Sequence, residues 1–115
     1  MTISISARAA QALLAAAMMT IAGAAAAEDP VVTLRIKDHK FEPSELVIPA
    51  ETRVKIVVHN DDATPEEFES HVLHREKMVR AGGQATIYVG PLSPGRYEFF
   101  GEKHPDSARG AVVVH

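Results

Sequence analysis

The sequence predicts an all-β sandwich that follows a short export signal, and three observations lead to this fold class. Apolar residues alternate with polar ones in several short runs after residue 30. Clusters of Pro, Gly, Asn and Asp separate these runs at intervals that suit turns between short strands. No segment after the N-terminal stretch has the periodicity of a long helix. Short strands at this spacing are typical of two β-sheets packed face to face.

The first 27 residues are expected to be a signal peptide and not part of the fold. Arg8 precedes a mostly apolar stretch over residues 9–22, and small residues follow it. A positive start, an apolar centre and an Ala-x-Ala site mark a secretory signal, here with cleavage after Ala27 or, as second choice, after Ala26. An uncleaved anchor is the alternative, but the stretch is Ala-rich and shorter than the ~20 strongly apolar residues of a span. We therefore expect a periplasmic protein whose domain covers residues 28–115.

Alternating runs mark the expected strands of this domain. In each run the apolar side chains at every second position would face the core, and the residues between them would face outward. The inward positions are, in chain order, Val32, Leu34 and Ile36; Leu46 and Ile48; Val54, Ile56 and Val58; Ala85, Ile87 and Val89; Tyr97 and Phe99; and Val112 and Val114.

Two features at the ends of these runs need separate treatment. Short helical turns are expected at residues 65–70 and 105–109, where the alternation lapses. Phe99 and Phe100 are adjacent in one expected strand, so they point to opposite faces and only one of them can belong to the core. The other would shield one end of the sandwich.

Composition excludes several classes of function. The formal charge is −3, and loss of Arg8 with the signal makes the mature chain −4. A mildly acidic chain without a basic tract argues against nucleic acid as a partner. The chain has no cysteine, which excludes disulfides, thiolate metal ligands and cysteine nucleophiles. It also lacks the G-x-S-x-G and H-E-x-x-H motifs of hydrolases, so turnover of an organic substrate is not expected.

Two parts of the chain resemble cupredoxin domains. Residues 38–49 and 54–60 resemble the opening strands of that family, and residues 96–115 resemble its closing loop and strand. In blue-copper proteins this closing loop begins with Cys and reaches a His a few residues later; here Gly101 stands in the Cys position, followed by His104. The resemblance implies a Greek-key β-sandwich without a blue-copper centre.

A narrower resemblance concerns function. Residues 65–70, 75–77, 88–91 and 95–102 are similar to the small periplasmic cupredoxin-like proteins that accompany bacterial high-affinity iron permeases. This similarity implies a role in iron uptake, with an iron permease or another periplasmic uptake component as partner.

The cupredoxin fold would bring two loops together at one end of the sandwich. The first carries Glu66, Glu67, Glu69 and His71, and the second carries Glu102, His104 and Asp106. His104 stands where the resemblance places a copper-binding imidazole; capping of the turn at Pro105 is its alternative role. Either Glu69 or His71 could be the ligand from the first loop. The acidic residues could instead form a solvated charge cluster, which is usual for such runs.

This ligand set contains carboxylates and imidazoles but no sulfur. Such donors suit Fe, Mn, Zn or Cu(II) in a non-blue site, and we expect iron or copper. Three functions remain open: metal binding in iron uptake with transfer to a permease, a metal-free scaffold that docks to a partner, and copper storage. His74 follows His71 too irregularly to share its metal, and His39, His59 and His115 are expected to be surface residues without partners.

Overall fold

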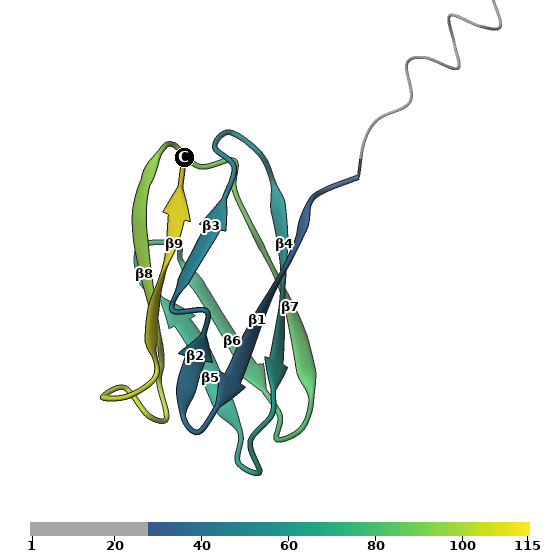
Figure 1. Cartoon of the computed structure of the whole chain (residues 1–115), viewed down its shortest axis with the longest axis vertical. Helices are drawn as coiled ribbons and strands as arrows, with labels where there is room; N and C mark the ends of the chain where they lie inside the picture. Colours follow the sequence, from purple (N-terminus) through teal and green to yellow (C-terminus); the bar gives the residue numbers. More distant parts are fainter. Residues whose placement is uncertain (1–27) are drawn as a thin grey trace, which may run out of the picture.

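The computed structural model describes residues 28–115, which form two β-sheets packed face to face (Figure 1). The expected signal peptide, residues 1–27, lies outside the described part of the chain. The described strands are β1 (Val31–Lys37), β2 (Lys40–Glu42), β3 (Glu45–Ile48), β4 (Val54–Asn60), β5 (Glu66–Ser70), β6 (Arg75–Val79), β7 (Gln84–Val89), β8 (Gly95–Gly101) and β9 (Arg109–Val114). The predicted all-β class is confirmed. No helix with the length and apolarity needed to cross a membrane occurs among these residues.

Both sheets are mixed. The four-stranded sheet has the order β2-β1-β4-β7, and the five-stranded sheet has the order β3-β9-β8-β5-β6. Strands β1 and β4 run parallel, as do β3 and β9, while the remaining neighbours are antiparallel.

The core lies between the sheets and follows the predicted alternation. Leu34, Ile36, Val54, Ile56 and Val58 are fully buried. Three aromatic rings fill the centre, with Phe41 edge-on to both Phe68 and Phe99. Phe99 is buried, whereas Phe100 on the opposite face of β8 is only half-buried. The expectation that one of these adjacent Phe residues faces the core and the other faces outward is confirmed.

The expected helical turn at residues 65–70 is wrong, because this segment is strand β5. It pairs with β6 along its length and with β8 at Phe68 and Glu69. The inward residues of β5 are Glu66, Phe68 and Ser70, so two of the three buried positions carry polar side chains. Buried and partly exposed positions therefore alternate along β5, but apolar and polar residues do not.

Of the segment expected to form the first loop, only the start of β5 meets the loop between β8 and β9, at the lower end of the molecule in Figure 1. The N–H of Glu102 donates to the carbonyl oxygen of Glu67 at 2.9 Å, which ties the loop between β8 and β9 to β5. The same loop contains the expected turn at residues 105–109, closed by the N–H of Ala108 on the carbonyl oxygen of His104 at 2.8 Å. The β1–β2 turn reaches the same end, because Ser107 Oγ donates to the carbonyl oxygen of His39 at 2.7 Å.

Candidate metal centre at the end of the sandwich

Glu66 is a buried carboxylate at the start of β5, with about 1% of the residue exposed. Its Oε1 accepts hydrogen bonds from the backbone N–H groups of Glu67 at 2.9 Å and Lys103 at 2.8 Å. Its Oε2 lies 2.7 Å from Nδ1 of His104. A buried charge is tolerated only when it is paired and hydrogen-bonded, and both oxygens of Glu66 meet this condition.

His104 lies in the loop between β8 and β9 and is partly exposed. Its Nδ1 faces Glu66, and its ring stacks on the ring of His39 with 3.6 Å between centroids and 15° between planes. The imidazole is thus held at one nitrogen by a carboxylate and on one face by a second imidazole. This arrangement fixes the ring in a single orientation.

His39 is presented by the two-residue turn between β1 and β2. Asp38 and His39 both have positive φ, 52° and 59°, in the left-handed region that residues other than Gly seldom adopt. The carboxylate of Asp62 accepts hydrogen bonds from both backbone N–H groups, at 2.8 Å from Asp38 and 2.9 Å from His39. The expectation that His39 lacks a partner is wrong, because His104, Asp62 and Ser107 all contact it.

Asp62 is the second residue of this site that the sequence did not reveal. Its Oδ2 lies 3.5 Å from Nδ1 of His39. The hydrogen bond from the N–H of His39 is the largest cause that holds the pKa of Asp62 below its ordinary value, against the opposing effect of burial. The run of Asn60, Asp61 and Asp62 before Pro65 predicts a turn in which a side chain accepts backbone hydrogen bonds. The sequence does not indicate which segment donates them.

Gly101 leaves the space that the Glu66 carboxyl group occupies. A Cβ at this position would lie 2.7 Å from Cδ and 2.8 Å from Oε2 of Glu66, and 2.7 Å from Cβ of Ala108. Any side chain here would therefore collide with the inward carboxylate. Because the space is filled and the chain has no cysteine, a copper–thiolate centre does not fit this site.

The remaining candidate ligands lie on the outer face of the five-stranded sheet. Glu67 and Glu69 alternate with Glu66 along β5 and point away from it. Glu69 Oε1 is 3.9 Å from Nδ1 of the exposed His71. The pKa of Glu67 is raised above its ordinary value, first by desolvation and then by the charge of Glu76 and a hydrogen bond with it, with smaller effects of Glu102 and Glu69.

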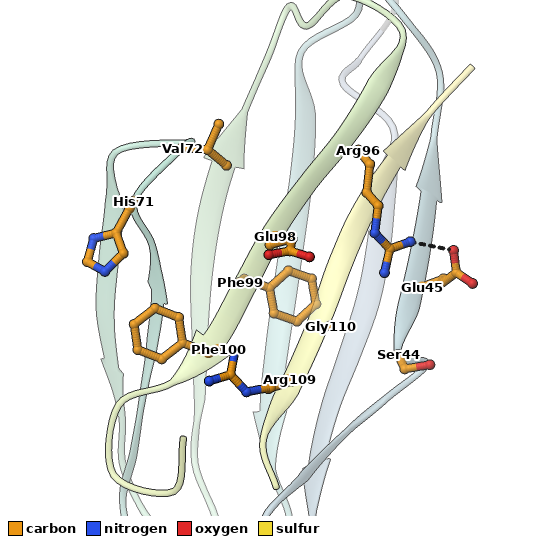
Figure 2. A pocket seen from close by; sticks show the side chains of 10 residues that line it. All are labelled: Ser44, Glu45, His71, Val72, Arg96, Glu98, Phe99, Phe100, Arg109 and Gly110. Atoms are coloured by element: carbon orange, nitrogen blue, oxygen red, sulfur yellow. Dashed lines mark hydrogen bonds and ion pairs between the residues drawn. The ribbon is translucent and has the colours of Figure 1, made fainter. Parts of the chain in front are cut away.

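A cavity of about 580 Å³ lies beside His71 on this outer face. Figure 2 shows His71 and Val72 at its edge, with the ring of Phe100 below them and the Arg96–Glu45 ion pair on the far side. His71 therefore belongs to the surroundings of Phe100, with 5.4 Å between the two ring centroids.

The six proposed ligands are thus divided between the two faces of β5. Glu66 and His104 meet inside, whereas Glu67, Glu69 and His71 lie outside; Glu102 is exposed in the loop next to them. Within residues 28–115, no three His, Asp or Glu side chains are grouped closely enough to hold a metal ion. Their role as ligands stays a prediction.

Comparisons with known proteins agree with this fold. The family model described as "Cupredoxin-like domain" matches residues 10–114. The chain belongs to the cupredoxin-like family. An uncharacterized protein of Rickettsia prowazekii (strain Madrid E) is 48% identical over 84 residues, which cover 73% of this chain and 67% of the relative.

Solved structures of other proteins match the sandwich at low identity. The metal-binding domain of the Cu(I)-exporting P-type ATPase CopA of Streptococcus pneumoniae D39, solved with Cu(I), is 15% identical with a TM-score of 0.67, covering 79% of this chain and 92% of that one. Auracyanin A, a blue copper protein of Chloroflexus aurantiacus, is 13% identical with a TM-score of 0.66, covering 76% and 100%. A purple cupredoxin of Nitrosopumilus maritimus is 19% identical with a TM-score of 0.59, covering 73% and 99%. Similarities at this level of identity establish the shared fold.

Proposed function

We propose that this protein is an exported, periplasmic component of iron uptake that binds iron or copper through Glu and His side chains. The metal is bound at the end of the sandwich where Glu66 meets His104. It is passed to a permease partner or, as Cu(II), accepts one electron from ferrous iron and becomes Cu(I). Residues 65–70 and 95–102, which resemble permease-associated cupredoxin-like proteins, support this role.

One observation carries the metal-binding part of the proposal. A buried carboxylate holds Nδ1 of a partly exposed imidazole at 2.7 Å. Metal-bound histidines in proteins almost always donate their other ring N–H to such a group, which fixes the ring and raises its basicity as a ligand. Two of the similar solved structures are described as a Cu(I)-bound domain and a blue copper protein, which makes copper a natural first ion to test.

The donor atoms favour particular ions. Carboxylate oxygens and imidazole nitrogens suit iron and Cu(II), whereas Cu(I) prefers sulfur. In the described chain the one thioether, Met78, lies on β6 beside Glu67 and not beside His104. Iron or Cu(II) is therefore the expected ion.

Metal analysis of the protein purified from its own periplasm tests the proposal directly. We expect about one iron or copper ion per chain and no intense blue absorption, because the thiolate that gives that band is absent. Replacement His104→Ala should remove the ion, while His74→Ala, at an exposed turn beyond the other end of β5, should retain it. A native protein without iron or copper, together with a His104→Ala variant that behaves as the native protein does in metal titrations, contradicts the proposal.

A metal-free scaffold is the second candidate, and a specific observation favours it. Both oxygens of Glu66 are already hydrogen-bonded, and within residues 28–115 no three candidate ligands are grouped. In this reading the acidic outer face around Glu67 and Glu69 docks to a periplasmic or membrane partner. Pull-down from periplasm in excess chelator separates the two functions: binding that survives chelation but fails in the Glu67→Ala, Glu69→Ala double variant supports the scaffold.

A further inference from the structure

We infer that the metal-binding atoms are the Nε2 nitrogens of His104 and His39, and that Glu66 and Asp62 orient these rings without binding the ion. The inference rests on the proposed function, since it names the ligands of that metal site. It also changes the ligand set, because His39 replaces Glu66.

The hydrogen bonding of His104 leaves one nitrogen for a ligand. We assign the proton of this contact to Nδ1, because Oε1 of Glu66 already accepts two backbone N–H groups and Oε2 is the remaining acceptor. In neutral imidazole the lone pair then lies on Nε2. No hydrogen bond in the described part of the chain reaches this atom, and no buried side-chain nitrogen there lacks a partner. The free lone pair therefore contacts solvent, where an ion can reach it.

The same pattern holds for His39. Its Nδ1 faces Oδ2 of Asp62 at 3.5 Å, and Nε2 makes no hydrogen bond within residues 28–115. Asp62 is itself fixed, because its two oxygens accept the backbone N–H groups of Asp38 and His39. The site thus contains two imidazoles whose Nδ1 atoms face carboxylates, His104 through a hydrogen bond of 2.7 Å and His39 at a longer distance of 3.5 Å.

The two rings are close enough to serve one ion. Two nitrogens on the same metal are at most about 4.2 Å apart, which is twice the usual metal–nitrogen bond of about 2.1 Å. The ring centroids are 3.6 Å apart and the ring planes differ by 15°, so the two Nε2 lone pairs lie in nearly parallel planes. One ion can accept both lone pairs only after one ring turns out of the stack. His39 is the ring that would turn, because 43% of its side chain is exposed and its link to Asp62 is long, whereas the side chain of His104 is 30% exposed and tightly bonded.

The backbone conformation of the β1–β2 turn supports a role for His39 as a ligand in addition to its place in the turn. Two consecutive positive-φ residues are the pattern of a type I′ hairpin turn, for which Asn-Gly or Asp-Gly is strongly preferred. Here His occupies the second position and is held there by the Asp62 carboxylate and by Ser107 Oγ. Backbone conformations of this kind persist where surrounding contacts determine them, and they concentrate at ligand sites.

Two neutral imidazoles in an open site select a borderline divalent ion. Copper(II), zinc, nickel and ferrous iron accept such donors, and water or a partner's side chain would complete the coordination. Because the ligands are nitrogens, the electron paramagnetic resonance spectrum of bound Cu(II) would show how many nitrogens bind the ion.

Cu(II) titration with electron paramagnetic resonance of the metal-free protein tests the inference. The wild type should show two equivalent imidazole nitrogens. His39→Phe keeps a flat ring on His104 but removes both nitrogens, and His39→Asn keeps the preference for positive φ but removes the ring. Both variants should show a single nitrogen and bind Cu(II) about 10–100-fold more weakly, in the range reported for disrupted metal-site groups.

Two further variants complete the design. His74→Asn is a matched control, since His74 also has a positive φ, 55°, but is exposed at the β5–β6 turn, and its affinity should not change. Glu66→Gln should weaken binding and leave one nitrogen, because the amide N–H facing Nδ1 moves the proton of His104 to Nε2, the atom that would bind the ion. Wild-type affinity in His39→Phe, or one nitrogen in the wild type, overturns the inference but leaves metal binding intact. A wild type that binds neither Cu(II) nor ferrous iron overturns the proposed function as well.

Discussion

The Oε2 atom of Glu66 and the Nδ1 atom of His104 lie 2.7 Å apart although the residues are separated by 38 positions in the chain. The same carboxyl group accepts the backbone N–H of Lys103, so one side chain ties β5 to the loop between β8 and β9 at two points. The conformation of that loop, and with it the position of His104, depends on Glu66.

Replacement of Glu66 should therefore cost stability in a graded way. Glu66→Ala leaves two backbone N–H groups and an imidazole without their acceptor in a buried place, and we expect a loss of about 3 kcal/mol in the free energy of unfolding. Glu66→Gln keeps an oxygen for the N–H groups and should lose about 1 kcal/mol. Urea denaturation measures both. Equal stability of Glu66→Ala and the wild type would show that the carboxylate is not structurally required.

Gly101→Ala should be more destabilising when Glu66 is present than when it is absent. The added methyl group would lie 2.7 Å from Cδ of Glu66, and overpacking of this kind typically costs about 1–3 kcal/mol. In a Glu66→Ala background the space is partly vacated, although Ala108 remains close, so the added cost should fall. A double-mutant cycle measures the coupling. Additive effects of the two substitutions would mean that the side chains do not compete for this volume.

Replacement of Asn60 by Asp, which has the same shape but can carry a charge, should destabilise the fold. It is 1% exposed, and its Nδ2 donates to the carbonyl oxygens of Thr64 and Val79 at 2.9 and 3.1 Å. Asn60→Asp replaces this donor with an oxygen that faces two carbonyl oxygens, so we expect a loss of about 3 kcal/mol or more. Calorimetric or urea unfolding measures the loss. The reverse exchange at the next position, Asp61→Asn, is the control, because Asp61 is exposed and little change is expected there. Equal losses in the two variants would contradict the role of the buried amide.

The contribution of Asp62 to the stability of the fold should be lost in acid. Its pKa is held below the ordinary value of 3.8 by the backbone N–H of His39, so the folded protein binds this proton less tightly than the unfolded chain does. The resulting stability is present above pH 3.8 and is lost as the pH falls through the lower pKa of the folded state. Asp62→Asn should be less stable than the wild type near neutral pH, and the difference should shrink in acid. A constant difference down to about pH 2 would contradict this assignment.

Glu67 should have the opposite effect. Its pKa is raised above the ordinary value of 4.5, chiefly by desolvation and by Glu76, so stability falls as the pH rises from 4.5 through the higher pKa of the folded state. Glu67→Gln should remove this decline and be more stable than the wild type near neutral pH. Unfolding measured across acid and neutral pH checks the sign, with Glu42→Gln, at the exposed end of β2, as the control. A Glu67→Gln variant that is less stable at neutral pH would refute the prediction.

The sheets could be predicted from the sequence because their inward positions are apolar at every second residue. Strand β5 was misjudged because its buried positions include Glu66 and Ser70, which look like surface residues. A buried Glu is stable only through partners contributed by other segments, and such partners are invisible in a local pattern. Once residues 66–70 form a strand, Glu66 must face away from Glu67 and Glu69, which is why the expected ligand set is divided.

His104 could be found because its loop resembles the cupredoxin closing loop, whereas His39 could not. Its neighbours are a ring from the β8–β9 loop and a carboxylate from the loop after β4, so only the packed sandwich reveals them. Its turn also lacks the Gly that usually marks two consecutive positive-φ positions.

The shared volume of Gly101 and Glu66 also restricts how this site can change over generations. A cysteine at position 101 would be destabilising while Glu66 is present, because its Cβ would lie 2.7 Å from Cδ of the carboxyl group. The less costly order toward a thiolate ligand shortens residue 66 before a cysteine appears at position 101, and the less costly order away from a thiolate is the reverse. Each of these routes therefore passes through a protein that has neither the cysteine nor the buried carboxylate.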